Sequence, residues 1–217
     1  MQEIIELTKE LYRIFDVLNE EYFDWELDQP IITLQKQKPN NYGHFIEEQT
    51  WSSLTTNQQW NEINLNPINL DRDVDDIIGV LLHEMVHYYN SMNGINDCSG
   101  IRHNKKFKAK AEEVGLVVEN DESIGYGITD ISDELRDFID NTIQPNKDAF
   151  SIFMDLGFTE EDKETKPRKK TQFKYICPKC GMVAKAKTGL NIVCGVCQVE
   201  LEMEDDDEII FTEEEKE

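Results

Sequence analysis

Apolar residues recur at steps of three and four along the first part of the chain. Ile4, Leu7, Leu11, Ile14 and Leu18 follow this spacing, which puts their side chains on one stripe of a helix. The pattern therefore predicts an amphipathic helix over residues 4–18.

Three short runs with strand character follow this helix. Residues 31–35 (IITLQ) are rich in β-branched side chains, and residues 42–46 (YGHFI) are mostly apolar or aromatic. Residues 62–66 (EINLN) alternate polar and apolar positions and stop at Pro67. We expect three short antiparallel strands, with the first two runs paired as a hairpin.

Helical spacing returns after Asp71. Asp71 or Asp73 can cap the new helix, and Gly94 is placed to end it. Its apolar stripe is wide, so this helix is expected to be buried on most sides. The stripe comprises Val74, Ile77, Ile78, Leu81, Leu82, Met85, Val86, Tyr88, Tyr89 and Met92.

Shorter helical patterns complete the main part of the chain. They lie at residues 103–115, 131–142 and 148–156, the last one closed by Gly157. A stretch without large apolar residues then predicts a linker, followed by a cysteine-bearing module and an acidic tail. The expected division is a main domain, a linker, a zinc ribbon and a tail, at residues 1–158, 159–172, 173–203 and 204–217.

The charge of the chain is strongly acidic. Its 217 residues include 45 acidic and 22 basic side chains, a net charge of −23, which opposes a nucleic-acid-binding surface over the whole protein. No apolar run approaches the ~18 residues that cross a bilayer. The start, MQEIIELTKE, lacks the basic and apolar blocks of a signal peptide. These features predict an intracellular, cytoplasmic protein without membrane partners.

The buried helix carries the sequence His83-Glu84-Met85-Val86-His87. Positions i and i+4 of a helix lie about 40° apart around its axis, so both imidazoles can reach one tetrahedral zinc ion. Glu84 lies beside them and can approach a zinc-bound water, whose pKa the metal lowers toward ~7. The motif predicts a zinc hydrolase with Glu84 as the catalytic base.

A catalytic zinc needs a third protein ligand and an open position. Glu112, Glu113 and Asp97 are candidates, but His103 is preferred because it is expected to start a helix. On that helix it would share a face with an apolar stripe packed on the buried helix. The other members of that stripe are Phe107, Ala111 and Val114.

Four of the five cysteines form two C-x-x-C pairs, Cys177/Cys180 and Cys194/Cys197. Two such knuckles supply four thiolates to one metal, which closes the tetrahedron and makes the site structural. A small hairpin around Thr188–Gly189 is expected between the knuckles. The chain is therefore predicted to hold two Zn²⁺ ions, one catalytic and one structural.

These motifs resemble the SprT-like zinc metalloproteases, the group that includes the Spartan DNA–protein-crosslink proteases. The resemblance covers about residues 5–130, through NEINLNP, LLHEMVHYY and RHNKKFKAKAEEVGL. It implies a zincin-like α+β domain, with His83 and His87 as ligands, Glu84 as the catalytic residue and His103 as the third ligand. It also implies peptidase activity, and some members similarly carry a C-terminal zinc ribbon.

Nucleic-acid binding is expected only from local basic clusters. Nine Lys or Arg residues and one acidic residue lie between Lys163 and Lys187. Weak DNA binding is expected through this linker and the ribbon, with Phe173 and Tyr175 able to stack on bases of single strands. The candidate phosphate-contact residues are Arg168, Lys169, Lys170, Lys105 and Lys106.

Three functional hypotheses follow. The first is a zinc peptidase that cleaves proteins, including DNA-associated ones. The second is a non-catalytic zinc-ribbon factor that binds nucleic acid or protein, and the third is a zinc protease with no nucleic-acid role.

Overall fold

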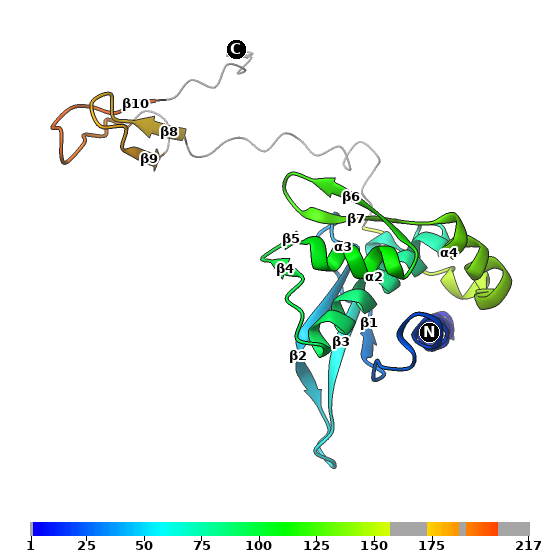
Figure 1. The fold of residues 1–217 in the computed structure, drawn as a ribbon. Helices are drawn as coiled ribbons and strands as arrows, with labels where there is room; N and C mark the ends of the chain where they lie inside the picture. Colours follow the sequence, from blue (N-terminus) through cyan, green and yellow to red (C-terminus); the bar gives the residue numbers. More distant parts are fainter. Residues whose placement is uncertain (1, 157–172, 187–189, 204–217) are drawn as a thin grey trace, which may run out of the picture. The chain divides into compact units, whose positions relative to one another are not determined.

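The computed structural model describes residues 2–156, 173–186 and 190–203. The chain forms two compact units, Met1–Gly157 and Phe158–Glu217, and each is described by itself. Both α-helices and small β-sheets are present (Figure 1), which confirms the predicted α+β class. The predicted linker, the whole acidic tail and the helix-closing Gly157 lie outside the described residues.

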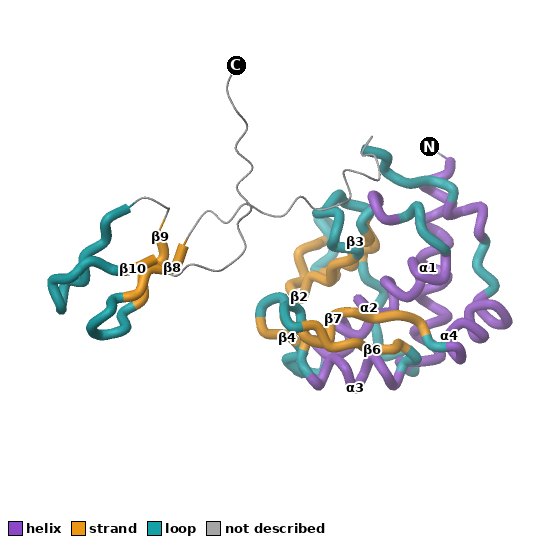
Figure 2. The backbone as a smooth tube through the Cα atoms, turned by 90° about the horizontal axis from the view of Figure 1, so that it is seen from above, coloured by secondary structure: helices purple, strands orange, loops and turns teal. Residues whose placement is uncertain are grey.

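Two long helices build the core of the first unit. α1 (Gln2–Phe23) extends the predicted helix at both ends and buries its stripe completely at Leu7, Leu11 and Leu18. α2 (Val74–Met92) begins after Asp73 as predicted. It packs against α1, against the first sheet and against the hairpin that follows α3, so it is the central element of the unit (Figure 2).

The first sheet differs from the predicted one. It contains β1 (Ile31–Thr33), β2 (Gly43–Ser52) and β3 (Gln59–Leu65) in the order β1-β3-β2. β1 pairs with β3 in parallel, and only β2 and β3 are antiparallel. The predicted hairpin between the first two strands was therefore wrong: the chain crosses over β3 instead of turning back.

Buried asparagines on and after β3 explain this crossover. The side chain of Asn64 accepts from the backbone N–H of Gln35 at 2.6 Å and donates to its carbonyl at 3.0 Å. Asn66 accepts from the N–H of Gln37 and donates to the carbonyls of Lys38 and Asn41. These amides satisfy backbone groups that a hairpin would have paired, and they hold the crossover segment against β3.

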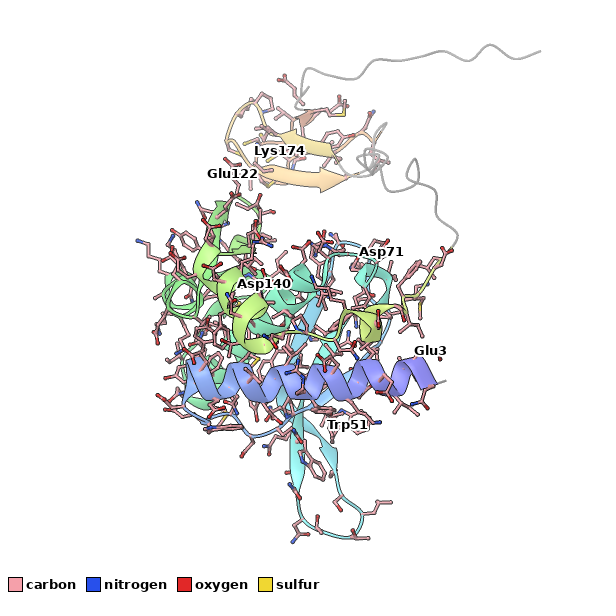
Figure 3. The ribbon with its side chains drawn as sticks, turned by 90° about the vertical axis from the view of Figure 1, so that its right-hand side faces the viewer. Glu3, Trp51, Asp71, Glu122, Asp140 and Lys174 are labelled. Carbon is pink, nitrogen blue, oxygen red and sulfur yellow. The ribbon has the colours of Figure 1, made fainter. Side chains whose placement is uncertain are left out.

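β2 and β3 form a hairpin, and both strands are longer than the runs predicted for them. The hairpin extends beyond the rest of the unit and carries Trp51 on that part (Figures 1 and 3). Trp51 faces Trp60 across the two strands and donates from Nε1 to the carboxylate of Glu62 at 2.7 Å. The outer half is exposed to solvent, and Leu54 is fully exposed.

A second sheet, absent from the prediction, follows α2. Its order is β4-β5-β7-β6, with α3 (Lys105–Glu113) between β5 and β6. The helix predicted from His103 is therefore shorter, because His103 belongs to a strand and Asn104 caps α3 by accepting from the N–H groups of Lys106 and Phe107. The strands are β4 (Cys98–Ser99), β5 (Arg102–His103), β6 (Leu116–Asp121) and β7 (Gly125–Ile131).

The helix predicted at 131–142 is present at nearly that range, whereas the last predicted helix is reduced to a short turn. Ser132 caps α4 (Asp133–Phe138), which continues as η2 (Ile139–Ile143). The pattern at 148–156 yields only the 3-10 turn η3 (Lys147–Phe150), and another such turn, η1 (Pro67–Asn69), precedes α2. Leu135, Ile139 and Ile143 are buried in the main core.

The second unit is a small three-stranded sheet in the order β10-β8-β9. β8 (Phe173–Ile176) pairs with β9 (Val183–Ala186) across the first knuckle, and β10 (Glu202–Met203) lies on the other side of β8. The predicted hairpin around Thr188–Gly189 lies outside the described residues. Tyr175 is 4% exposed, which contradicts its predicted role in stacking on bases.

We predict that Asn66→Ala destabilises the protein by at least about 2 kcal/mol, because three backbone groups of the crossover lose their partner. Urea unfolding of the purified chain measures this change. Asn57→Ala, in the exposed turn of the β2–β3 hairpin, is the matched control and should stay within about 0.5 kcal/mol of the parent. Equal stability of the two variants would contradict the structural role of Asn66.

Candidate metal centre

Two elements bring three histidines together. His83 and His87 lie one turn apart on α2, and His103 lies on β5. Their Nε2 atoms are 3.0 Å apart for His87 and His103 and 3.2 Å apart for the other two pairs. The sequence predicted these three residues as a group, and the structure brings all of them to one point.

The partners of the other ring nitrogens fix how these imidazoles are protonated. His87 Nδ1 donates to Asp97 Oδ2 at 2.8 Å, and His103 Nδ1 lies 3.3 Å from the carbonyl oxygen of Ile124. Both partners only accept, so each Nδ1 carries the proton and each Nε2 presents a lone pair. His83 Nδ1 is 3.0 Å from the hydroxyl of Thr129.

This arrangement fits a zinc ion. Tetrahedral zinc–nitrogen bonds of 2.0–2.1 Å place neighbouring nitrogens about 3.3 Å apart, close to the observed separations. Lone pairs held this close cannot hydrogen-bond to one another, whereas a cation would bind all three. His83, His87 and His103 are therefore residues that could hold zinc with one position left open.

The surroundings favour the neutral form of His83 and His103 but not that of His87. Burial lowers the pKa of His83 well below its ordinary value, and the charges of His87 and His103 lower it further. Burial also lowers the pKa of His103. Burial acts in the same sense on His87, but the hydrogen bond that its Nδ1 donates to Asp97 and the charges of Glu84 and Asp97 outweigh it, so the pKa of His87 is raised.

Phe107 and Gly127 pack directly on the histidines. The Phe107 ring is fully buried, with its centroid 4.6 Å from that of each imidazole. On β7, a Cβ on Gly127 would lie 2.6 Å from His103 Nδ1. A side chain at Gly127 would therefore push His103 out of place.

Glu84 lies beside this cluster without joining it. Its side chain is 6% exposed, and burial raises its pKa to about 7, partly offset by the charge of His87 and the backbone N–H of Phe45. A Cβ on Gly43 would lie 2.7 Å from Glu84 Oε1. The start of β2 thus lies directly against the Glu84 carboxyl, and glycine permits that approach.

The other candidates for a third ligand lie elsewhere. Glu112 pairs with Lys108 at 2.8 Å and Glu113 with Lys110 at 2.9 Å. Asp97 contacts Nδ1 of His87, on the far side of the ring from the three Nε2 atoms. The preference for His103 agrees with this geometry, although the helical face invoked for it was wrong because His103 lies on a strand.

Sequence reasoning missed Thr129, Gly127 and the carbonyl of Ile124 as partners of the histidines. All three lie in or next to β7, which no periodic pattern had predicted. The two glycines of Gly125-Tyr126-Gly127 were the available signal, since glycines two apart in a strand mark a close approach of another segment.

The four ribbon cysteines form a second candidate site. The sulfur atoms of Cys177, Cys180, Cys194 and Cys197 all lie within 4.8 Å of one another, and those of Cys180 and Cys194 are 3.7 Å apart. Two sulfur atoms bound to one tetrahedral zinc ion at 2.3 Å lie about 3.8 Å apart, close to the observed separation. Burial would raise the pKa of Cys177, but backbone N–H groups of Cys180 and Lys179 help to lower it to about 7.

The two knuckles repeat one backbone pattern. In the first, Cys177 donates to Met182 and accepts from Gly181. In the second, Cys194 donates to Val199 and accepts from Gln198. Gly181 and Gln198 both have positive φ, 70° and 53°, as two equivalent tight turns require.

The basic candidates are only partly described. Lys105 and Lys106 are exposed in the first turn of α3, whereas Arg168, Lys169 and Lys170 lie outside the described residues. Among the described helices, none is long and apolar enough to cross a membrane.

The fold and these two clusters define a mixed α+β domain with a three-histidine site, joined in one chain to a four-cysteine ribbon. A family model described as the SprT-like family matches residues 11–125, which is more than half of the chain. The chain therefore belongs to the SprT-like family. Searches of the curated proteins and of the solved structures gave no significant match.

We predict that Gly127→Ala empties the three-histidine site, because the new methyl group displaces His103. Elemental analysis should show one zinc per chain fewer than in the parent. Asn57→Ala, in the exposed turn of the β2–β3 hairpin, is the control, and it should keep the parental zinc content. Full zinc content in Gly127→Ala would contradict the role given to His103.

Proposed function

We propose that this protein is a zinc-dependent peptidase of the SprT-like type. The observation that supports this most directly is the convergence of three Nε2 atoms beside the buried carboxyl of Glu84. His83, His87 and His103 would hold the catalytic zinc, and the four ribbon cysteines a structural zinc. A bound zinc ion supplies Lewis acidity that polarises a carbonyl group and acidifies a water molecule.

Glu84 is the proposed general base. Burial raises its pKa to about 7, which suits a group that gains and loses a proton near neutral pH. It would accept a proton from the water that attacks the peptide carbonyl and return it to the departing amine. The N–H of Phe45 and the close backbone of Gly43 hold the carboxyl for this exchange.

The edge of β2 is the proposed place for the substrate. β2 is an outer strand of its sheet, and its first residue, Gly43, lies directly against the Glu84 carboxyl. An extended polypeptide can pair with such an edge through its main chain. The peptide bond next to Glu84 would then be the one cleaved, which supports protein as the substrate class.

We predict that Glu84→Gln lowers peptide hydrolysis by a factor of about 10²–10⁴ and leaves the zinc content unchanged, since an amide cannot accept the proton. A casein or peptide cleavage assay, paired with elemental analysis, measures both. Glu134→Gln, at an exposed position of α4, is the matched control. Full activity of Glu84→Gln would refute this assignment, and an inactive parent with filled sites would favour a binding factor.

DNA binding is a second, weaker proposal. Residues 1–157 contain 30 acidic and 12 basic side chains, so contact with phosphate depends on local clusters within the screening length of roughly 10 Å. Lys108 and Lys110, which also lie on α3, form ion pairs, which leaves Lys105 and Lys106 as the exposed lysines of this helix. We propose weak, sequence-independent binding through these two and the basic stretch from Lys163 to Lys187.

For this proposal, the double variant Lys105→Gln/Lys106→Gln should weaken single-stranded DNA binding and reduce the salt slope by about 1–2. Fluorescence anisotropy at several salt concentrations measures both quantities. Lys36→Gln/Lys38→Gln makes the same charge change at two other exposed lysines and should have little effect. Equal losses in both variants, or no binding of the parent at low salt, would reject a DNA-binding face on α3.

A further inference from the structure

Asp97 receives hydrogen bonds from two side chains around the three-histidine cluster. Its Oδ2 accepts from His87 Nδ1 at 2.8 Å and from Asn90 Nδ2 at 3.0 Å. The sulfur of Cys98 lies within 4.8 Å of this carboxylate. The carboxylate is 13% exposed, so it is largely withdrawn from water and its hydrogen bonds are strengthened.

The position of Asp97 argues against its being a zinc ligand of the three-histidine site. His87, Asp97 and Cys98 do form a group whose donor atoms lie within 4.8 Å of one another. The carboxylate, however, faces Nδ1, and the hydrogen bond there keeps the proton on that nitrogen. This proton is what leaves the Nε2 lone pair of His87 directed at His83 and His103.

The main chain of Asp97 is tied to the element that carries His103. Its carbonyl oxygen accepts from the N–H of Asn104 at 2.9 Å. Asn104 follows His103 directly and also donates from its side chain to the carbonyl of Asn96 at 3.0 Å. In the β4–β5 pair, Cys98 lies opposite His103.

We propose that Asp97 is a positioning residue for two zinc ligands at once. Its side chain sets the tautomer and ring orientation of His87, and its main chain sets the placement of His103. This inference rests on the proposed zinc site, but it concerns metal affinity and not hydrolysis.

The test measures the zinc affinity of the three-histidine site in the full chain. The chain is titrated in buffers of known free zinc concentration, and the binding of the second zinc equivalent is followed. Removing a carboxylate that supports a ligating histidine weakens metal binding by about 10–100-fold, and we expect this loss in Asp97→Ala. Asp97→Asn keeps an oxygen acceptor and should lose less. Asn90→Ala removes the other donor to the same oxygen without touching Nδ1, and it should lose least.

A second readout separates positioning from a general effect on folding. Nitrogen-15 NMR of the zinc-loaded chain should show His87 protonated at Nδ1 in the parent and in Asp97→Asn. In Asp97→Ala this signal should be lost or exchange-broadened. Because Asp97→Asn preserves the shape of the loop, it keeps the test decisive if Asp97→Ala fails to fold.

Three results would overturn the proposal: unchanged affinity in Asp97→Ala, an unchanged His87 signal there, or equal losses in the alanine, asparagine and Asn90→Ala variants. A different result would reject the proposed peptidase function. A parent chain that binds two zinc ions and has no hydrolytic activity would reject the peptidase and leave the role of Asp97 intact.

Discussion

The Nε2 atoms of His83, His87 and His103 converge to 3.0–3.2 Å from one another, and the lone pairs of His87 and His103 repel each other unless a cation lies between them. Much of the surrounding structure serves to hold them there. Acceptors on Asp97 and Ile124 keep the protons on the opposite nitrogens, and Phe107 packs against all three rings. The apolar packing lowers the dielectric around the site, which strengthens both the repulsion without metal and the attraction with it.

The three-histidine cluster also explains why α2, a buried helix, carries the carboxyl group of Glu84. A charged side chain at 6% exposure is costly in a structural role, and Glu84 has no ion-pair partner among the described residues. Its pKa of about 7 and its contact with the N–H of Phe45 suit a group that exchanges protons. The amide hydrogen bonds of Asn64 and Asn66 hold the crossover segment that leads into β2. They therefore help to place the start of β2 against Glu84.

Features that depend on residues close together in the sequence could be predicted, whereas features that depend on contacts between distant segments could not. The spacing of His83 and His87 and the two cysteine knuckles follow from helix geometry and from short tight turns, so both could be predicted. The strand of His103 has two residues, too few for a periodic pattern. The parallel pairing of β1 depends on amide hydrogen bonds between segments about thirty positions apart, and Thr129 and Gly127 reach the histidines from a hairpin that folds back after α3.

Anomalous diffraction at the zinc absorption edge, on crystals of the full chain grown with zinc, tests the central claim most directly. The account predicts two zinc peaks per chain, one bonded to the Nε2 atoms of His83, His87 and His103 and one among the four ribbon sulfurs. A single peak at the cysteines, or a second peak bonded to Asp97 and Cys98 in place of the three Nε2 atoms, would contradict it.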